Sequence, residues 1–99
     1  MPMIVGIGRL SVHIPDSHSL KDKRRVVISI TQRVRARFDV AIAEVDDQEL
    51  WQVAAIGIVS LSNSSQHADE VLQRVIAFVE QNLQAGYLTD VQTEIMHLD

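Results

Sequence analysis

The residues best suited to bind a ligand are the positive charges gathered between positions 21 and 37. That segment holds seven of the nine Lys and Arg residues and a single acid, Asp22, so it carries a net charge of +6 in a chain whose net charge is −4. Cations at the start of a helix oppose the helix macrodipole, so local stability does not explain the bases at its N-terminal end. A basic helix on an acidic body suits a polyanion such as RNA. We expect the contacts to come from Lys21, Lys23, Arg24, Arg25, Arg35 and His13.

Two other interpretations of this segment stay open. Basic side chains along a helix are often only a solvated face. Alternatively, His13, Lys23 and Arg24 hold a small anionic ligand near the helix start, as in a homo-oligomeric regulatory domain. At about 100° per residue, Lys23 falls within the apolar face of the helix. There it either snorkels past the sheet edge or reaches toward such an anion.

The remaining polar residues form no motif for catalysis or metal binding. The four histidines, His13, His18, His67 and His97, lack the spacing of a helical metal site. The absence of cysteine excludes disulfides, thiolate ligands and cysteine nucleophiles. Gly6 and Gly8 lie within a predicted strand, where they allow close helix packing rather than phosphate binding. We expect no metal, no cofactor and no catalytic residue, and a binding protein more than an enzyme.

An acidic run surrounds the turn between the second and third predicted strands, at Glu44, Asp46, Asp47 and Glu49. Such a run usually forms a solvated turn. The second possibility is that Glu44 pairs with a base of the first helix. Glu44 shares a strand face with Val40 and Ile42, and a partly buried carboxylate needs a partner.

Hydrophobic periodicity predicts the elements that carry these residues. Strands are expected at 3–14, 40–45, 51–61 and 87–98. One helix starts at Ser17 or Ser19, where SLKD resembles a capping box, and runs to about Phe38. A second helix follows SNSS and ends at Gly86. The order βαββαβ predicts one domain, 1–99, with an α+β, ferredoxin-like fold: a four-stranded antiparallel sheet with two helices on one face.

The sheet face without helices is expected to be apolar. Its predicted residues include Val5, Ile7, Ile56 and Ile58 and no aromatic side chain, so RNA bases are not expected to stack there. An exposed aliphatic patch of this kind predicts homo-oligomerisation, in the simplest case a dimer. Trp51, the only tryptophan, is expected to pack at the end of the sheet, with a partner-binding role as the alternative.

Several blocks of the sequence resemble the YlxP-like family, also called DUF503. The resemblance extends over nearly the whole chain and is carried by HIPDSHSLKDKRR, RFDVAIAEVDDQELWQ and SNSSQHADEVL. Asp16 departs from the glycine common in the family, and Asp47 from the histidine or asparagine frequent there. The resemblance implies a ferredoxin-like fold and a bacterial cytosolic protein of uncharacterised function. The family's genes often neighbour those of translation initiation and ribosome maturation factors, which implies a ribosome or RNA partner.

Together these features predict a non-enzymatic, cytoplasmic protein that binds RNA or another polyanion through its first helix, in association with the ribosome or translation. No apolar run approaches the roughly 18 residues that a membrane helix needs, so no membrane association is expected.

Overall fold

The computed structural model describes residues 2–99 and confirms the predicted order of elements. These are β1 (Met3–His13), α1 (Leu20–Arg37), β2 (Ala41–Asp46), β3 (Val53–Ser62), α2 (Ser65–Asn82) and β4 (Tyr87–Leu98).

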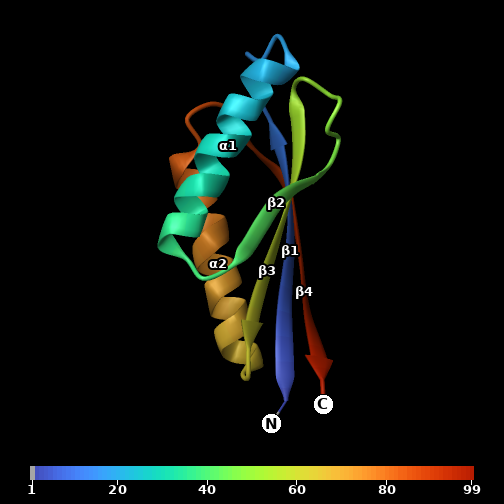
Figure 1. Cartoon of the computed structure of the whole chain (residues 1–99), viewed down its shortest axis with the longest axis vertical. Coiled ribbons are helices and arrows are strands. Elements are labelled where there is room, and N and C mark those ends of the chain that lie inside the picture. The colour runs from blue at the N-terminus through green and yellow to red at the C-terminus, as the bar shows by residue number, and fades with distance from the viewer. Residues whose placement is uncertain (1) are drawn as a thin grey trace.

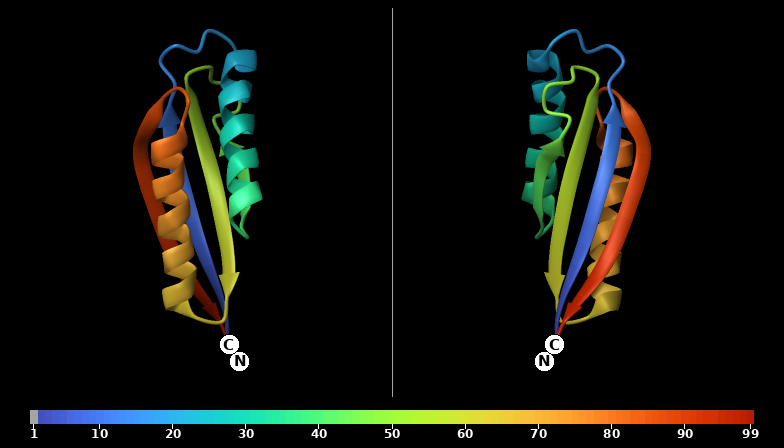
Figure 2. Two further views of the ribbon diagram at one scale, coloured as in Figure 1. Left: turned by 90° about the vertical axis from the view of Figure 1, so that its left-hand side faces the viewer. Right: turned by 90° about the vertical axis from the view of Figure 1, so that its right-hand side faces the viewer.

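The four strands form one sheet in the order β2-β3-β1-β4, with every neighbouring pair antiparallel. Both helices cover the same face of this sheet (Figure 1), and the two side views show that the opposite face carries no helix (Figure 2). We call that uncovered surface the open face. This arrangement is the ferredoxin-like α+β sandwich that the sequence predicts.

Helix α1 begins where the sequence predicts a capping box. The Ser19 side chain accepts a hydrogen bond from the Asp22 backbone N–H at 3.0 Å. The Asp22 carboxylate in turn accepts one from the His18 backbone N–H at 2.9 Å, one residue before the cap. An N-cap of this kind typically contributes about 1 kcal/mol to the free energy of unfolding. It sets the residue at which the helix begins, and thus where on the helix the basic residues lie.

The hydrophobic core lies between the helices and the sheet. Alternate residues of β1 point into it, which is why Ile4, Leu10 and Val12 are at most 2 % exposed. The helices contribute stripes at helical spacing, namely Val27, Ile30 and Val34 from α1, and Leu72, Val75 and Val79 from α2.

The predicted face of β3 is wrong. Ile56 and Ile58 are 1 % and 0 % exposed and belong to the core beneath the helices. Register explains this, because Ile56 pairs with the core residue Leu10 and cross-strand partners share a face. The open face of β3 instead carries Val59 and Leu61, which pair with Ile7 and Val5 of β1.

Candidate anion-binding surface on helix α1

Three of the predicted contacts form an exposed basic cluster on the first two turns of α1. Lys21, Arg24 and Arg25 are all exposed. Within residues 2–99 the ion pairs are Arg9–Asp46 and Lys23–Glu44, so none of the three is neutralised by an acid. We call Lys21, Arg24 and Arg25 the α1 basic cluster. Its charges are free to meet an anion from solution.

Lys23 does not belong to this cluster, which corrects the sequence prediction. Its side chain is 0 % exposed and its ammonium lies 2.9 Å from Glu44 Oε2. It also donates hydrogen bonds to the backbone carbonyls of Asp47 and Val53, at 2.7 Å and 3.2 Å. Because the ammonium is buried and already held by one carboxylate and two carbonyls, it is not available to a ligand. The expectation that Lys23 snorkels past the sheet edge is equally wrong.

The pairing of Glu44 with a helix base, the second of the two interpretations of the acidic run, is confirmed. The Glu44 side chain is 17 % exposed, and within residues 2–99 its buried Oε2 forms this ion pair but has no hydrogen-bond partner. The pair lies under the hairpin that joins β2 to β3. There Asp47 adopts a φ of 58°, a left-handed conformation that Asp tolerates better than most residues.

The bases at the C-terminal end of α1 hold the helix against its neighbours. Arg35 Nη2 donates a hydrogen bond of 2.6 Å to the Ile42 carbonyl of β2. Arg33 donates to the Asn82 carbonyl at the end of α2, at 2.9 Å. Arg33 and Arg37 lie 5.7 Å and 5.2 Å from the centre of the Phe78 ring. Arg35 is exposed, but its guanidinium is oriented toward β2, so it is at most a peripheral anion contact.

His13 is separated from the basic cluster. Alternate residues of a strand point to the same face, so His13 lies on the open face together with Arg9 of β1. Helix α1 packs on the other side of the sheet. Its ring lies 5.6 Å from that of Tyr87, its cross-strand partner on β4. A small-anion site built from His13, Lys23 and Arg24 is therefore not formed.

The hairpin loop between β2 and β3 exposes two large apolar side chains. Trp51 is 55 % exposed and Leu50 is 50 % exposed, so the expected packing of Trp51 at the sheet end is wrong. The loop is nonetheless held firmly. The Gln52 side chain donates to the carbonyls of Pro15 and Ser17, at 2.9 Å and 3.1 Å.

An ion pair on the open face also escaped the sequence analysis. Arg9 Nη2 lies 3.1 Å from Asp46 Oδ2, and both side chains are substantially exposed. The backbone N–H of Asp47, which donates to Asp46, and the Arg9 guanidinium together lower the pKa of the Asp46 carboxyl. The two residues are 37 positions apart, so only the sheet register brings them together.

Neither a metal site nor a membrane helix is found in the described part of the chain. No three His, Cys, Asp or Glu residues within residues 2–99 are arranged to hold a metal ion. Over the same residues, neither helix is at once long and apolar enough to cross a membrane.

Comparison with known proteins gives three similarities. A model of the family described as "Protein of unknown function (DUF503)" matches residues 5–93. The chain is 38% identical over 77 residues to a protein of Bacillus subtilis described as "Uncharacterized protein YlxP", an alignment covering 78% of this chain and 84% of that one. The solution NMR structure of a de novo designed protein with ferredoxin fold is 13% identical, with a TM-score of 0.49 over 93% of this chain and 83% of the other.

Proposed function

We propose that this chain, which belongs to the DUF503 family, is a non-enzymatic RNA-binding protein that contacts phosphates through the α1 basic cluster. A cytoplasmic location and an association with the ribosome or translation are part of the proposal. The observation that carries it is that Lys21, Arg24 and Arg25 are exposed and without an acidic partner in residues 2–99. The fold itself makes no visible use of these charges.

The contrast with the other bases of the helix supports this role. Lys23, Arg33 and Arg35 each bond to a group elsewhere in the fold, so a structural reason exists for them. In the basic cluster, Lys21 lies in the first turn and opposes the helix dipole at a cost of about 0.3 kcal/mol, and Arg24 and Arg25 in the second turn gain nothing from the dipole. A ligand that gains from their positive charge accounts for this arrangement.

The chemistry of the cluster favours phosphate contacts over base recognition. Lysine and arginine bind phosphate oxygens, and such contacts position a nucleic acid without reading its sequence. The cluster offers only three bases, and the whole chain is acidic with a net charge of −4. The affinity for RNA is therefore expected to be moderate and to fall steeply as the salt concentration rises. The family resemblance, which implies a partner in translation, supports RNA as the polyanion.

Titration of a fluorescently labelled structured RNA tests the proposal. Anisotropy is measured at several salt concentrations for the wild type and for the triple variant Lys21→Gln, Arg24→Gln, Arg25→Gln. The triple variant should bind more weakly, and the slope of log affinity against log salt should fall by about 1 for each phosphate that the variant no longer binds.

A matched pair of single variants separates local contact from overall charge. Arg25→Gln and Arg74→Gln each remove one exposed base, the first from the cluster and the second from the middle of α2. Arg25→Gln should weaken binding more than Arg74→Gln. Equal affinities and equal salt slopes for the wild type and the triple variant would show that the cluster is a solvated face that binds no RNA.

A further inference from the structure

The half of the open face that lies nearest the chain termini is a continuous apolar surface. Register makes it continuous, because Val5 of β1 pairs with Leu61 of β3 on one side and with Met96 of β4 on the other. The exposed fractions are large for such side chains, with Leu61 at 67%, Leu98 at 61% and Met96 at 50%. We call this surface the apolar half, made of Met3, Val5, Ile7, Val59, Leu61, Met96 and Leu98.

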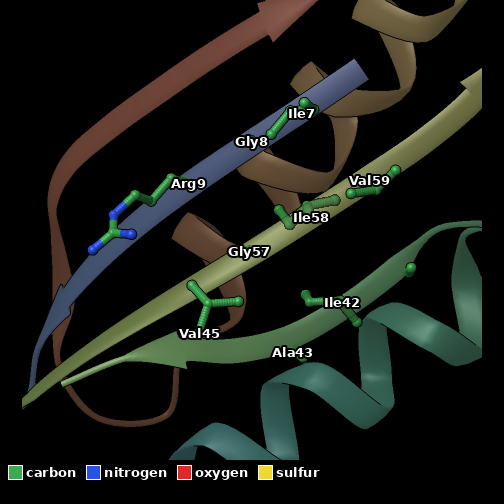
Figure 3. A pocket seen from close by; sticks show the side chains of 10 residues that line it. Ile7, Gly8, Arg9, Ile42, Ala43, Val45, Gly57, Ile58 and Val59 are labelled. Carbon is green, nitrogen blue, oxygen red and sulfur yellow. The ribbon is translucent and has the colours of Figure 1, made fainter. Parts of the chain in front are cut away.

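Beside the apolar half lies a shallow hollow of about 430 Å³ over β1, β3 and β2. Figure 3 shows Ile7 and Val59 at one end of it, and Val45 and Arg9 toward the other. Its lining is aliphatic apart from Arg9. A hollow of this chemistry accommodates aliphatic side chains from an opposing surface.

We propose that the open face is buried against the open face of a second copy of this chain, giving a two-fold symmetric dimer. The two sheets would pack face to face, about 10 Å apart, with their aliphatic side chains interdigitated. A two-fold interface uses the same patch on both subunits, so the patch must be complementary to itself. The apolar half satisfies this requirement because none of its members is charged.

The size of the open face agrees with the size of a stable interface. Neighbouring strands lie about 4.8 Å apart and each residue advances a strand by about 3.3 Å. The strands β1, β2, β3 and β4 have 11, 6, 10 and 12 residues, so they present roughly 600 Å² before side-chain relief is included. Specific interfaces bury about 600–1,000 Å² on each partner, so the whole open face reaches the size of such an interface.

The charges of the open face fall where an interface tolerates them. Arg9 and Asp46 are already paired with each other and lie outside the apolar half, farther along the strands from the chain termini. Glu94, next to Ile7, and Asp90, next to Ser11, are both on the edge strand β4, where solvent can reach them. The face thus has an apolar core bordered by polar groups, as protein interfaces commonly have. Neither helix takes part, so the α1 basic cluster would stay exposed on both outer surfaces of the dimer.

Sedimentation equilibrium over a range of protein concentrations tests the proposal. The wild type should be a dimer, whereas Leu61→Asp and Met96→Asp should each raise the dimer dissociation constant at least about 100-fold, because the unpaired charge is buried twice. The matched control is Ile28→Asp on the outer face of α1, where Ile28 is 51% exposed, and it should remain a dimer. Circular dichroism and thermal unfolding establish that each variant is folded.

A labelling experiment gives an independent readout that does not need a disrupted interface. The chain has no cysteine, so Leu61→Cys and Ile28→Cys each provide a unique thiol. Alkylation at Leu61→Cys should slow at least tenfold as protein concentration rises through the dimer range, while that at Ile28→Cys should not change. A wild type that is monomeric at all concentrations overturns the proposal. A dimer would also contradict the proposal if Ile28→Asp weakened it as much as the sheet variants do. The same holds if the thiol of Leu61→Cys were not protected in the dimer.

Discussion

Lys23 and Glu44 form a buried ion pair, with 2.9 Å between Nζ and Oε2, that joins the first turn of α1 to β2. The same ammonium donates to two carbonyls of the hairpin region, those of Asp47 and Val53. One side chain therefore fixes three points of the fold at the end where the basic cluster lies. The pair orients the start of α1, and its charge is not available to a ligand.

Removing either partner should destabilise the protein, and removing Lys23 should cost more. Lys23→Met leaves Glu44 and two carbonyls without their donor, so we expect a loss of about 3 kcal/mol in the free energy of unfolding. Glu44→Gln keeps an acceptor near the ammonium and should cost about 1 kcal/mol. Urea unfolding followed by circular dichroism measures both. A Lys23→Met protein as stable as the wild type would mean that an apolar side chain serves there equally well.

The basic cluster should be neutral or slightly unfavourable for stability. Lys21→Gln removes a cation from the first turn of α1 and should raise the free energy of unfolding by about 0.3 kcal/mol at low salt, whereas Arg24→Gln and Arg25→Gln, in the second turn, should change it less. The gain should shrink as salt is added. Arg74→Gln, in the middle of α2, is the control without a dipole effect. A marked loss of stability in the triple variant would show that these residues have a structural role.

The fold was predictable because each element carries a local signal. Alternation along β1 identifies its core residues, and the SLKD cap and the apolar stripe define α1. The helical angle correctly placed Lys23 among the apolar residues of α1. The pairing of Lys23 with Glu44 in particular was not predictable, because Glu44 lies on a strand that only the tertiary fold brings near.

The orientation of β3 was not predictable from its own sequence. Val59 and Leu61 on one side and Ile56 and Ile58 on the other are all aliphatic, so a period of two does not say which set faces the core. Pairing with β1 decides it, since Leu10 opposite Ile56 points toward the helices. The exposure of Trp51 was unpredictable for a similar reason, since it depends on how the hairpin loop is held.

Part of the protein's sensitivity to acid should come from Asp46. The backbone N–H of Asp47 and the Arg9 guanidinium lower the pKa of this carboxyl in the folded state. A lowered folded pKa contributes stability that is present above the pKa of the unfolded chain and is lost as pH falls through the folded value. Asp46→Asn should therefore reduce stability near neutral pH and make it less sensitive to acid. Arg9→Gln should raise the pKa of Asp46 in an NMR titration, and an unchanged value would show that the ion pair does not form in solution.

Gly6 and Gly8 lie on the same face of β1, but replacing each with alanine should have a different effect on stability. A Cβ on Gly6 would lie 2.6 Å from Ser60 Oγ and 3.3 Å from the Ala68 carbonyl of α2, whereas one on Gly8 would meet its nearest atom, in Leu72, at an ordinary 3.6 Å. Ser60 Oγ also donates to that Ala68 carbonyl, at 3.2 Å, and the new methyl group would disturb this bond. Gly6→Ala should thus cost about 1–3 kcal/mol through overpacking. Gly8→Ala should be neutral or stabilise by up to about 1 kcal/mol through the unfolded chain.

The Ser60→Ala background tests the cause of that difference. It removes the atom closest to the new methyl group, so Gly6→Ala should cost less in Ser60→Ala than in the wild type, with the remaining cost due to the Ala68 carbonyl and the Leu72 side chain. Thermal unfolding of the four proteins in this cycle, with Gly8→Ala as the control, measures the coupling. If the two glycines tolerate alanine equally well, α2 does not approach β1 more closely at Gly6 than at Gly8.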